Sequence, residues 1–184
     1  IAVVMSVIGM QVSSAWAQKA PAEDEAKIQT GLKELQSAIQ ELKSRPKPPD
    51  ARLIADVEIY AKAVEWCLAH DEFYVPKNNP DAKSSYGKLC YTALSSGQAR
   101  AKELAEGKPS WPTKTGSTMR GYVSRVDGSV QPYALRLPNS FADAKQAYRW
   151  PLHVVLHGRG GDRNEVRFSA DHDNKAIKDD QAWI

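Results

Sequence analysis

The stretch that decides the fold is PLHVVLHGRGGD, residues 151–162. Its first half, Pro151–Leu156, is a short apolar run opened by a proline, which is typical of a central parallel strand covered on both faces. Its second half has three glycines within four residues. Glycine lets the backbone approach a ligand closely and adopt positive φ, so that N–H groups can converge on a developing negative charge. The stretch predicts a buried strand that runs into an anion-stabilising turn.

The residues after this stretch extend the pattern. Asp162 and Glu165 have the spacing of a capping box, which predicts a helix that starts at Asp162. Val166 and Phe168 are expected to face inward from that helix. Gln181–Ile184 is typical of the beginning of another buried strand. The order strand, glycine turn, helix, strand is that of a parallel α/β sheet.

A β-hairpin is predicted upstream of the glycine turn. Gly121–Val126 and Ser129–Leu137 are rich in large and β-branched residues. They flank Asp127-Gly128, a strong signal for a two-residue hairpin turn. Pro132 restricts the returning strand to a sheet edge or a bulge. An antiparallel hairpin is therefore expected to precede the parallel strand.

These segments resemble a known family. LHGRGG, residues 156–161, resembles the HGGG-type oxyanion segment of α/β-hydrolases, with Arg159 as a variant at one motif position. The combination of VDGSVQPYALRLP, residues 126–138, with the stretch at 151–161 is similar to secreted esterases of the prolyl-oligopeptidase-like kind. The resemblance implies that residues 121–184 form the N-terminal part of an α/β-hydrolase domain.

The resemblance also implies roles for the glycine turn. In the family, a backbone N–H just after the His-Gly pair binds the oxyanion, which matches Arg159, with Gly160 as the second candidate. His157, Gly158 and Gly161 would support this loop. The Arg159 side chain would either contact an anionic substrate group or be solvated. The alternatives to an oxyanion loop are a plain strand-to-helix turn and, less favoured because the glycines do not follow G-x-G-x-x-G, a phosphate loop.

The sequence does not contain the catalytic triad that such a loop would serve. The family nucleophile is a serine in G-x-S-x-G, followed by an acid and a histidine, and no serine of this sequence lies in that frame. We therefore interpret the chain as a fragment of an exported serine hydrolase that cleaves carboxylic esters, or less readily peptides, through an acyl-enzyme. The alternative is a non-catalytic binding protein of the cell envelope that retains the fold.

An export signal is predicted at the start of the chain. Residues 1–17 carry no charge, and the apolar run Ile1–Val12 has the length of a signal-peptide core. Ala15-Trp16-Ala17 fits the A-x-A cleavage rule. A retained membrane anchor is the alternative, although the run is short for the roughly 20 residues of a span. We expect cleavage, a periplasmic or extracellular protein, and no stable membrane span afterwards.

Three helices are predicted between residues 18 and 110. The first begins near Glu23–Glu25, the second is capped by Asp50, and the third runs from Asp81 to about Glu106. Apolar residues recur at helical spacing on one face of each, which favours an antiparallel bundle. After export, Cys67 and Cys90 would lie in an oxidising compartment, where they form either a disulfide or two buried thiols.

The expected fold class is α plus α/β: a three-helix region followed by the first strands of a truncated α/β-hydrolase sheet. The predicted organisation is residues 1–17 partial signal peptide, 18–110 helical extension, 111–120 linker and 121–184 hydrolase part. The net charge of +3 is spread along the chain, which does not favour nucleic acid as a partner. A small ester or peptide substrate is expected, and the oligomeric state is left open.

Two acid–histidine clusters lack the arrangement expected of a metal site. His70-Asp71-Glu72 lies at a predicted helix end, where histidine is common because it complements the helix dipole. Asp171-His172-Asp173 consists of adjacent residues, whose side chains point apart. We therefore predict neither a metal ion nor a cofactor.

Overall fold

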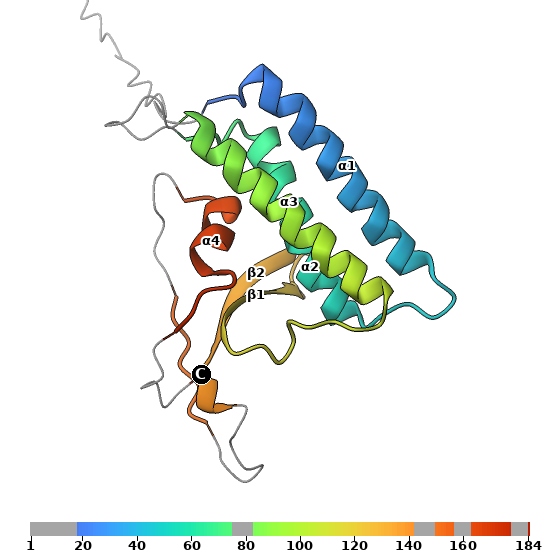
Figure 1. Ribbon diagram of the computed structural model, residues 1–184, viewed down its shortest axis with the longest axis vertical. Coiled ribbons are helices and arrows are strands. Elements are labelled where there is room, and N and C mark those ends of the chain that lie inside the picture. Colours follow the sequence, from blue (N-terminus) through green and yellow to red (C-terminus); the bar gives the residue numbers. More distant parts are fainter. Residues whose placement is uncertain (1–17, 75–82, 142–149, 157–162, 178–183) are drawn as a thin grey trace, which may run out of the picture.

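The structure is a computed structural model that describes residues 18–74, 83–141, 150–156, 163–177 and 184. Within these ranges the chain forms four α-helices, a short 3-10 helix at Asn139–Phe141 and a two-stranded antiparallel sheet, a mixed α+β architecture. Figure 1 shows three long helices packed together, with the strands and the fourth helix against one side of them.

The three predicted helices are confirmed as α1 (Ala22–Ser44), α2 (Ala51–Ala69) and α3 (Lys83–Ala105). The Asp50 side chain caps α2 as expected, because its Oδ1 accepts a hydrogen bond from the Arg52 backbone N–H at 2.9 Å. Side-chain hydrogen bonds from Arg52 hold the pKa of this exposed carboxyl at about 2. The inward face of α1 is the predicted apolar stripe: Ile28, Leu32, Leu35, Ile39 and Leu42.

The helix α2 lies at the centre of the molecule, because it packs against α1, α3 and the sheet. Its sequence is apolar on nearly all sides, which is the pattern of a buried helix. One core joins the helical part to the rest of the chain, since Trp111, Met119 and Val166 belong to the same hydrophobic cluster as the helices. No helix of the described residues is long and apolar enough to span a membrane.

The predicted hairpin is present, but its first strand starts earlier than expected. The strand β1 runs from Gly116 to Val123 and pairs with β2, Val130–Leu137, in a register that joins Gly116 to Leu137. The expected linker at residues 111–120 is therefore half strand. Its strand character was hidden because residues 116–119 are all buried, so the sequence shows no alternation of polar and apolar residues.

The predicted two-residue turn is also wrong. The Ser124 backbone N–H donates to the Ser129 carbonyl at 2.8 Å, which closes a four-residue loop between them. Gly128 has φ +71° in this loop, so the glycine serves a left-handed position of a longer turn. Pro132 lies opposite Gly121 in the edge strand β2, as expected, and the register continues through it without a bulge.

Residues 151–156 do not form the expected buried strand. Leu152, Val154, Val155 and Leu156 have between 68 and 89% of their surface exposed. The segment pairs with Ile184 through two backbone hydrogen bonds, but these four apolar side chains are exposed. The apolar run therefore has the sequence of a buried strand, but its side chains are exposed in the structure.

The helix that follows the glycine turn begins later than predicted. The fourth helix, α4, spans Glu165–His172, and its N-cap is Asn164 rather than Asp162. The Asn164 Oδ1 accepts the Arg167 backbone N–H at 3.1 Å. Glu165 is thus the first helical residue, and its carboxylate pairs with Lys62 at 2.7 Å instead of closing a capping box. Val166 is buried, as expected, and Phe168 is half-buried.

Candidate functional site

The glycine turn predicted as an oxyanion loop lies outside the described residues. His157, Gly158, Arg159, Gly160 and Gly161 all belong to the range 157–162. Both flanks of that range are described. The geometry of the candidate site is therefore built from the segment before it and the helix after it.

The segment before the turn makes a parallel pairing with the end of the described chain. The Ile184 N–H donates to the Pro151 carbonyl at 2.9 Å, and the His153 N–H donates to the Ile184 carbonyl at 2.7 Å. This is the hydrogen-bond pattern of neighbouring parallel strands, in which one residue bonds to two alternate residues of its partner. Residues 157–162 consequently follow the carboxyl end of a segment paired in parallel, and α4 lies between the two partners in sequence.

The helix after the turn is anchored by its capping residue. Asn164 Nδ2 donates to the Glu72 carbonyl at 3.0 Å and lies 3.6 Å from Cys67 Sγ. Its Oδ1 is used by Arg167, so the amide group caps α4 and ties it to the end of α2 at the same time. The first turn of α4 is therefore fixed to the helical bundle immediately after the glycine turn.

Near this anchor lie the two cysteines, Cys67 of α2 and Cys90 of α3. Both are fully buried free thiols. A hydrogen bond with the Cys90 thiol and burial raise the pKa of Cys67. Cys67 Sγ also donates to the Glu72 carbonyl at 3.4 Å. The raised pKa makes the Cys67 thiol a poor nucleophile, and the Cys90 thiol lies beside it.

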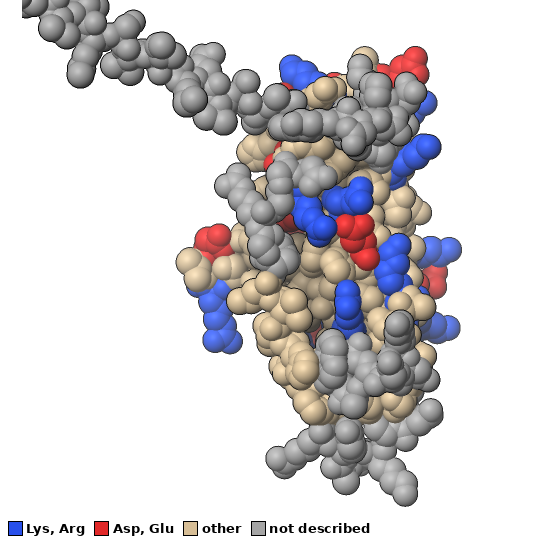
Figure 2. Space-filling model, turned by 90° about the vertical axis from the view of Figure 1, so that its left-hand side faces the viewer, with Lys and Arg blue, Asp and Glu red and all other residues tan. Residues whose placement is uncertain are grey.

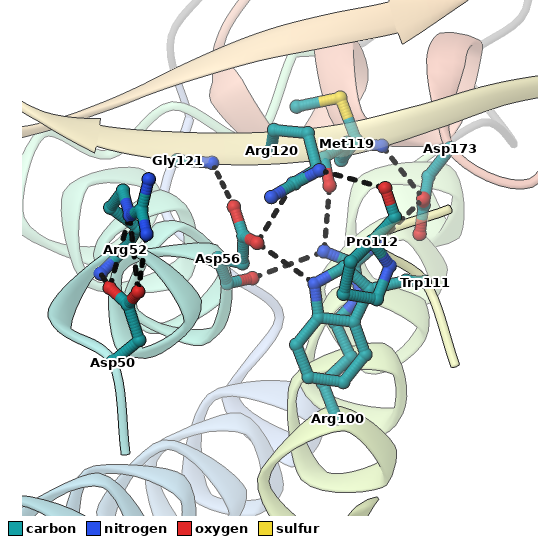
Figure 3. Close-up of polar contacts among 10 residues, drawn as sticks. All are labelled: Asp50, Arg52, Asp56, Arg100, Trp111, Pro112, Met119, Arg120, Gly121 and Asp173. Carbon is teal, nitrogen blue, oxygen red and sulfur yellow. Dashed lines mark hydrogen bonds and ion pairs between the residues drawn. The ribbon is translucent and has the colours of Figure 1, made fainter. Parts of the chain in front are cut away.

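A second cluster of charged side chains lies where α2 meets β1 (Figure 3). The Asp56 side chain is completely buried and accepts three hydrogen bonds. Its Oδ1 accepts from the Gly121 N–H at 2.7 Å, and its Oδ2 accepts from Trp111 Nε1 and from Arg120 Nε, each at 2.8 Å. A buried carboxylate is tolerated at such a position only because it is paired and hydrogen-bonded.

Arg100 of α3 continues the cluster toward α4. Its Nη1 donates to the Met119 carbonyl at 2.7 Å, and its Nη2 pairs with Asp173 Oδ1 at 3.1 Å. Asp173 also accepts from the Met119 N–H, at 3.1 Å, and from the Tyr60 hydroxyl, at 2.8 Å. Burial raises the pKa of Tyr60, so this hydroxyl stays a donor. The Arg100 guanidinium is 5.0 Å from the centre of the Tyr60 ring and 5.1 Å from that of Trp111.

These contacts make the Asp56–Arg100–Arg120–Asp173 cluster a structural clamp. Its charges bond to one another, to β1 main-chain groups and to aromatic donors. Alternate residues of β1 point their backbone groups away from β2. Ser117 bonds to the Lys175 backbone. Met119 bonds to Arg100 and Asp173, and the Gly121 N–H bonds to Asp56. The clamp thus bonds the Met119 backbone and the Gly121 N–H at the outer edge of β1, and Asp173 holds the end of α4 beside that edge.

The two acid–histidine clusters lie at helix ends. His70 is the C-cap of α2 and stacks edge-on against Trp66 at 5.5 Å. Asp171 pairs with Arg167 on the surface, whereas Asp173 belongs to the clamp. Among the described residues, no three His, Cys, Asp or Glu side chains gather in a way that would hold a metal ion.

A shallow groove of about 480 Å³ runs along α1 and α3. Its lining contains no histidine or cysteine, and it is far from residues 150–156 in the fold (Figure 1). The face shown in Figure 2 carries Lys, Arg, Asp and Glu side chains interspersed.

Comparison of the chain with protein-family models, with curated proteins and with solved structures found no match in any of the three.

Sequence reasoning missed the clamp and the anchor of α4. Local sequence does not mark Asp56 as a site residue, because it lies within an apolar helix pattern, yet an acid at an inward position of such a helix indicates a buried partner. Its partners Trp111 and Arg120 lie 55 and 64 residues away, so no local pattern connects them. Asn164 could have been found as an N-cap, since asparagine is as good a cap as aspartate.

Proposed function

We propose that this chain carries the oxyanion-hole loop of an exported serine hydrolase of the α/β-hydrolase fold. The hydrolase would act on carboxylic esters, or less readily on peptides, through an acyl-enzyme. In this proposal, Arg159 and Gly160 contribute backbone N–H donors, and the nucleophile and its acid and base come from residues other than these 184.

The observation that supports the proposal is the parallel pairing of Pro151 and His153 with Ile184. In parallel α/β sheets, ligands bind beyond the carboxyl ends of the strands, where the connections to the following helices lie. In this proposal, the glycine-rich residues 157–161 supply that binding position, because they follow the parallel-paired segment and precede the capped helix α4 in the sequence. The HGGG-like residues 157–161 are those of an oxyanion loop in this context.

The chemistry asked of this loop is the stabilisation of negative charge. When the serine oxygen attacks the carbonyl carbon, the π electrons move to the carbonyl oxygen and form a tetrahedral oxyanion. Backbone N–H groups held about 3 Å from that oxygen stabilise the transition state, and the loss of one donor reduces kcat by about 10²–10³-fold. The anchoring of α4 by Asn164 supports the proposal, because such donors act only when their backbone is held in place.

A fluorophosphonate probe tests the proposal on the complete gene product. The probe forms a covalent bond with an activated serine, so we expect one labelled serine in a G-x-S-x-G sequence, with labelling blocked by prior treatment with a sulfonyl fluoride. A complete gene product that folds but takes no label would contradict the hydrolase and favour the non-catalytic binding protein.

Two substitutions at one position then test the loop. Arg159→Pro removes the donor N–H, and we expect kcat/KM on an aryl ester to fall by about 10²–10³-fold. Arg159→Ala keeps the N–H and controls for loss of the side chain, and we expect it to retain activity within about tenfold on a neutral ester. Equal activities of the two variants would show that the backbone donor is not used.

A further inference from the structure

We propose that Cys67 and Cys90 are a disulfide site, and that the bond between them rigidifies the first turn of α4 through Asn164. This inference goes beyond the hydrolase proposal and does not depend on it. It concerns the covalent state of the bundle and its connection to the helix that follows the glycine turn.

The two thiols lie in the core between neighbouring helices. Both side chains are fully buried, one in the last turns of α2 and the other in the first half of α3, and these helices pack directly against each other. The Cys90 thiol is near enough to raise the pKa of Cys67. A bond between Cys67 and Cys90 would therefore close the connection between two packed helices without moving either of them far.

The link to α4 is made by the Asn164 amide. Its Nδ2 contacts two groups of the α2 end, the Glu72 carbonyl at 3.0 Å and Cys67 Sγ at 3.6 Å, while its Oδ1 holds the Arg167 N–H at 3.1 Å. A bond that limits the motion of Cys67 therefore also limits the motion of the Asn164 amide, which caps α4. After oxidation Cys67 has no S–H to donate, so the Glu72 carbonyl relies on Asn164 for its side-chain donor, which favours the observed position of the amide.

Bond formation is a two-electron oxidation. Each thiol loses one proton and one electron, and a sulfur–sulfur bond forms. A low-molecular-weight disulfide such as oxidised glutathione, or the oxidised dithiol of a thiol–disulfide oxidoreductase, accepts the two electrons and is reduced to two thiols. Because the thiols are buried and the pKa of Cys67 is raised, attack by the thiolate is slow in the folded protein. The bond is therefore expected to form while the chain folds.

Refolding in a glutathione redox buffer tests the inference. The reduced, denatured protein is refolded with reduced and oxidised glutathione, and linked peptides are sought by mass spectrometry. We expect a single Cys67–Cys90 linkage and a Tm about 10 °C above that of the reduced protein. Hydrogen exchange at the Arg167 amide, which reports the cap, is expected to slow in the oxidised form.

Three variants control the test. Cys67→Ser and Cys90→Ser cannot form the bridge, and we expect their Tm to be unaffected by the redox buffer. Asn164→Asp keeps the cap acceptor but lacks the amide donor, so exchange at Arg167 should no longer respond to oxidation, although the bridge still forms. Two free thiols after refolding in excess oxidised glutathione would overturn the disulfide site. A redox response at Arg167 that persists in Asn164→Asp would overturn the role of Asn164.

Discussion

Gly121 has no side chain, and this allows β1 to lie close against α2. A Cβ atom built on Gly121 would lie 2.2 Å from the Ala55 carbonyl oxygen, a backbone atom that cannot move aside. The same glycine donates its N–H to Asp56. The close approach and the clamp therefore depend on one another.

We expect Gly121→Ala to destabilise the protein by more than about 4 kcal/mol, because β1 must move away from α2 and the Asp56 bond is lost. Gly107→Ala is the matched control: Gly107 ends α3 with φ +71° and has nothing within 4 Å of its Cβ position. That change should cost only about 1–2 kcal/mol of backbone strain. Urea denaturation measures both, and similar losses in the two variants would contradict the proximity argument.

The charge of Asp56 is expected to contribute a similar amount to the free energy of unfolding. Asp56→Asn retains an acceptor but leaves Arg120 without its carboxylate, and breaking a buried pair costs about 3–5 kcal/mol. Asp171→Asn removes a carboxylate from the surface pair with Arg167 and should cost less than about 1 kcal/mol. Thermal and urea unfolding compare the two, and a cost for Asp56→Asn as small as that for Asp171→Asn would show that the clamp contributes little.

Among the secondary-structure elements, α4 depends most on contacts with other parts of the chain, because it has only eight residues. The Glu165–Lys62 pair ties its first turn to α2. Burial raises the pKa of Glu165, and the neighbouring Glu72 adds to the rise, although Lys62 opposes it. The folded state therefore holds the Glu165 proton to higher pH than the unfolded chain does.

This difference predicts a dependence on pH. An acid whose pKa is raised by folding favours the folded state at low pH and loses that contribution as pH rises from the unfolded value, near 4.5, through the folded one. Glu165→Gln removes the titration and keeps an acceptor for Lys62. We expect the Tm of Glu165→Gln minus that of the original protein to increase between pH 4 and pH 7. A difference that falls over this range would contradict the direction of the shift.

At the same scale, the elements that could be predicted are those with a local cause. The stripe of α1, the Asp50 cap and the glycine after α3 all act within a few residues, and the three helices were predicted from them. The start of β1 could not be predicted, because its burial on both faces is produced by α2 and by Lys175, far away in the sequence. The cap of α4 was misplaced by two residues because Glu165 pairs with Lys62.

At the scale of the whole molecule, the helical part and the β part form one structure. Trp111 and Met119 belong to the core of the bundle, and Arg100 joins α3 to β1 and to the end of α4. The sequence suggested a helical extension joined by a linker, because no local pattern reveals a core shared between distant segments. The clamp residues were missed for the same reason, whereas the glycine turn was found because its signal is contiguous.

A shared core predicts a single unfolding transition. We expect the loss of helix measured by far-ultraviolet circular dichroism and the exchange of the Met119 amide, which is bonded to Asp173, to follow the same urea dependence. Both report on the clamp, since α2 and β1 cannot separate while Asp56 and Arg100 remain bonded to the strand. Exchange at Met119 that precedes the loss of helix would show that the two parts unfold independently.

The two edges of the hairpin differ, because the outer edge of β1 is hydrogen-bonded to other parts of the chain. A strand from another molecule cannot add beside Ser117 and Met119, whose backbone groups are already bonded within the chain, or pair with the Gly121 N–H, which is bonded to Asp56. The other edge of this hairpin is β2, where an added strand would meet Pro132, which has no N–H to donate. Self-association through this hairpin should therefore begin at β2, where the proline in the edge opposes aggregation.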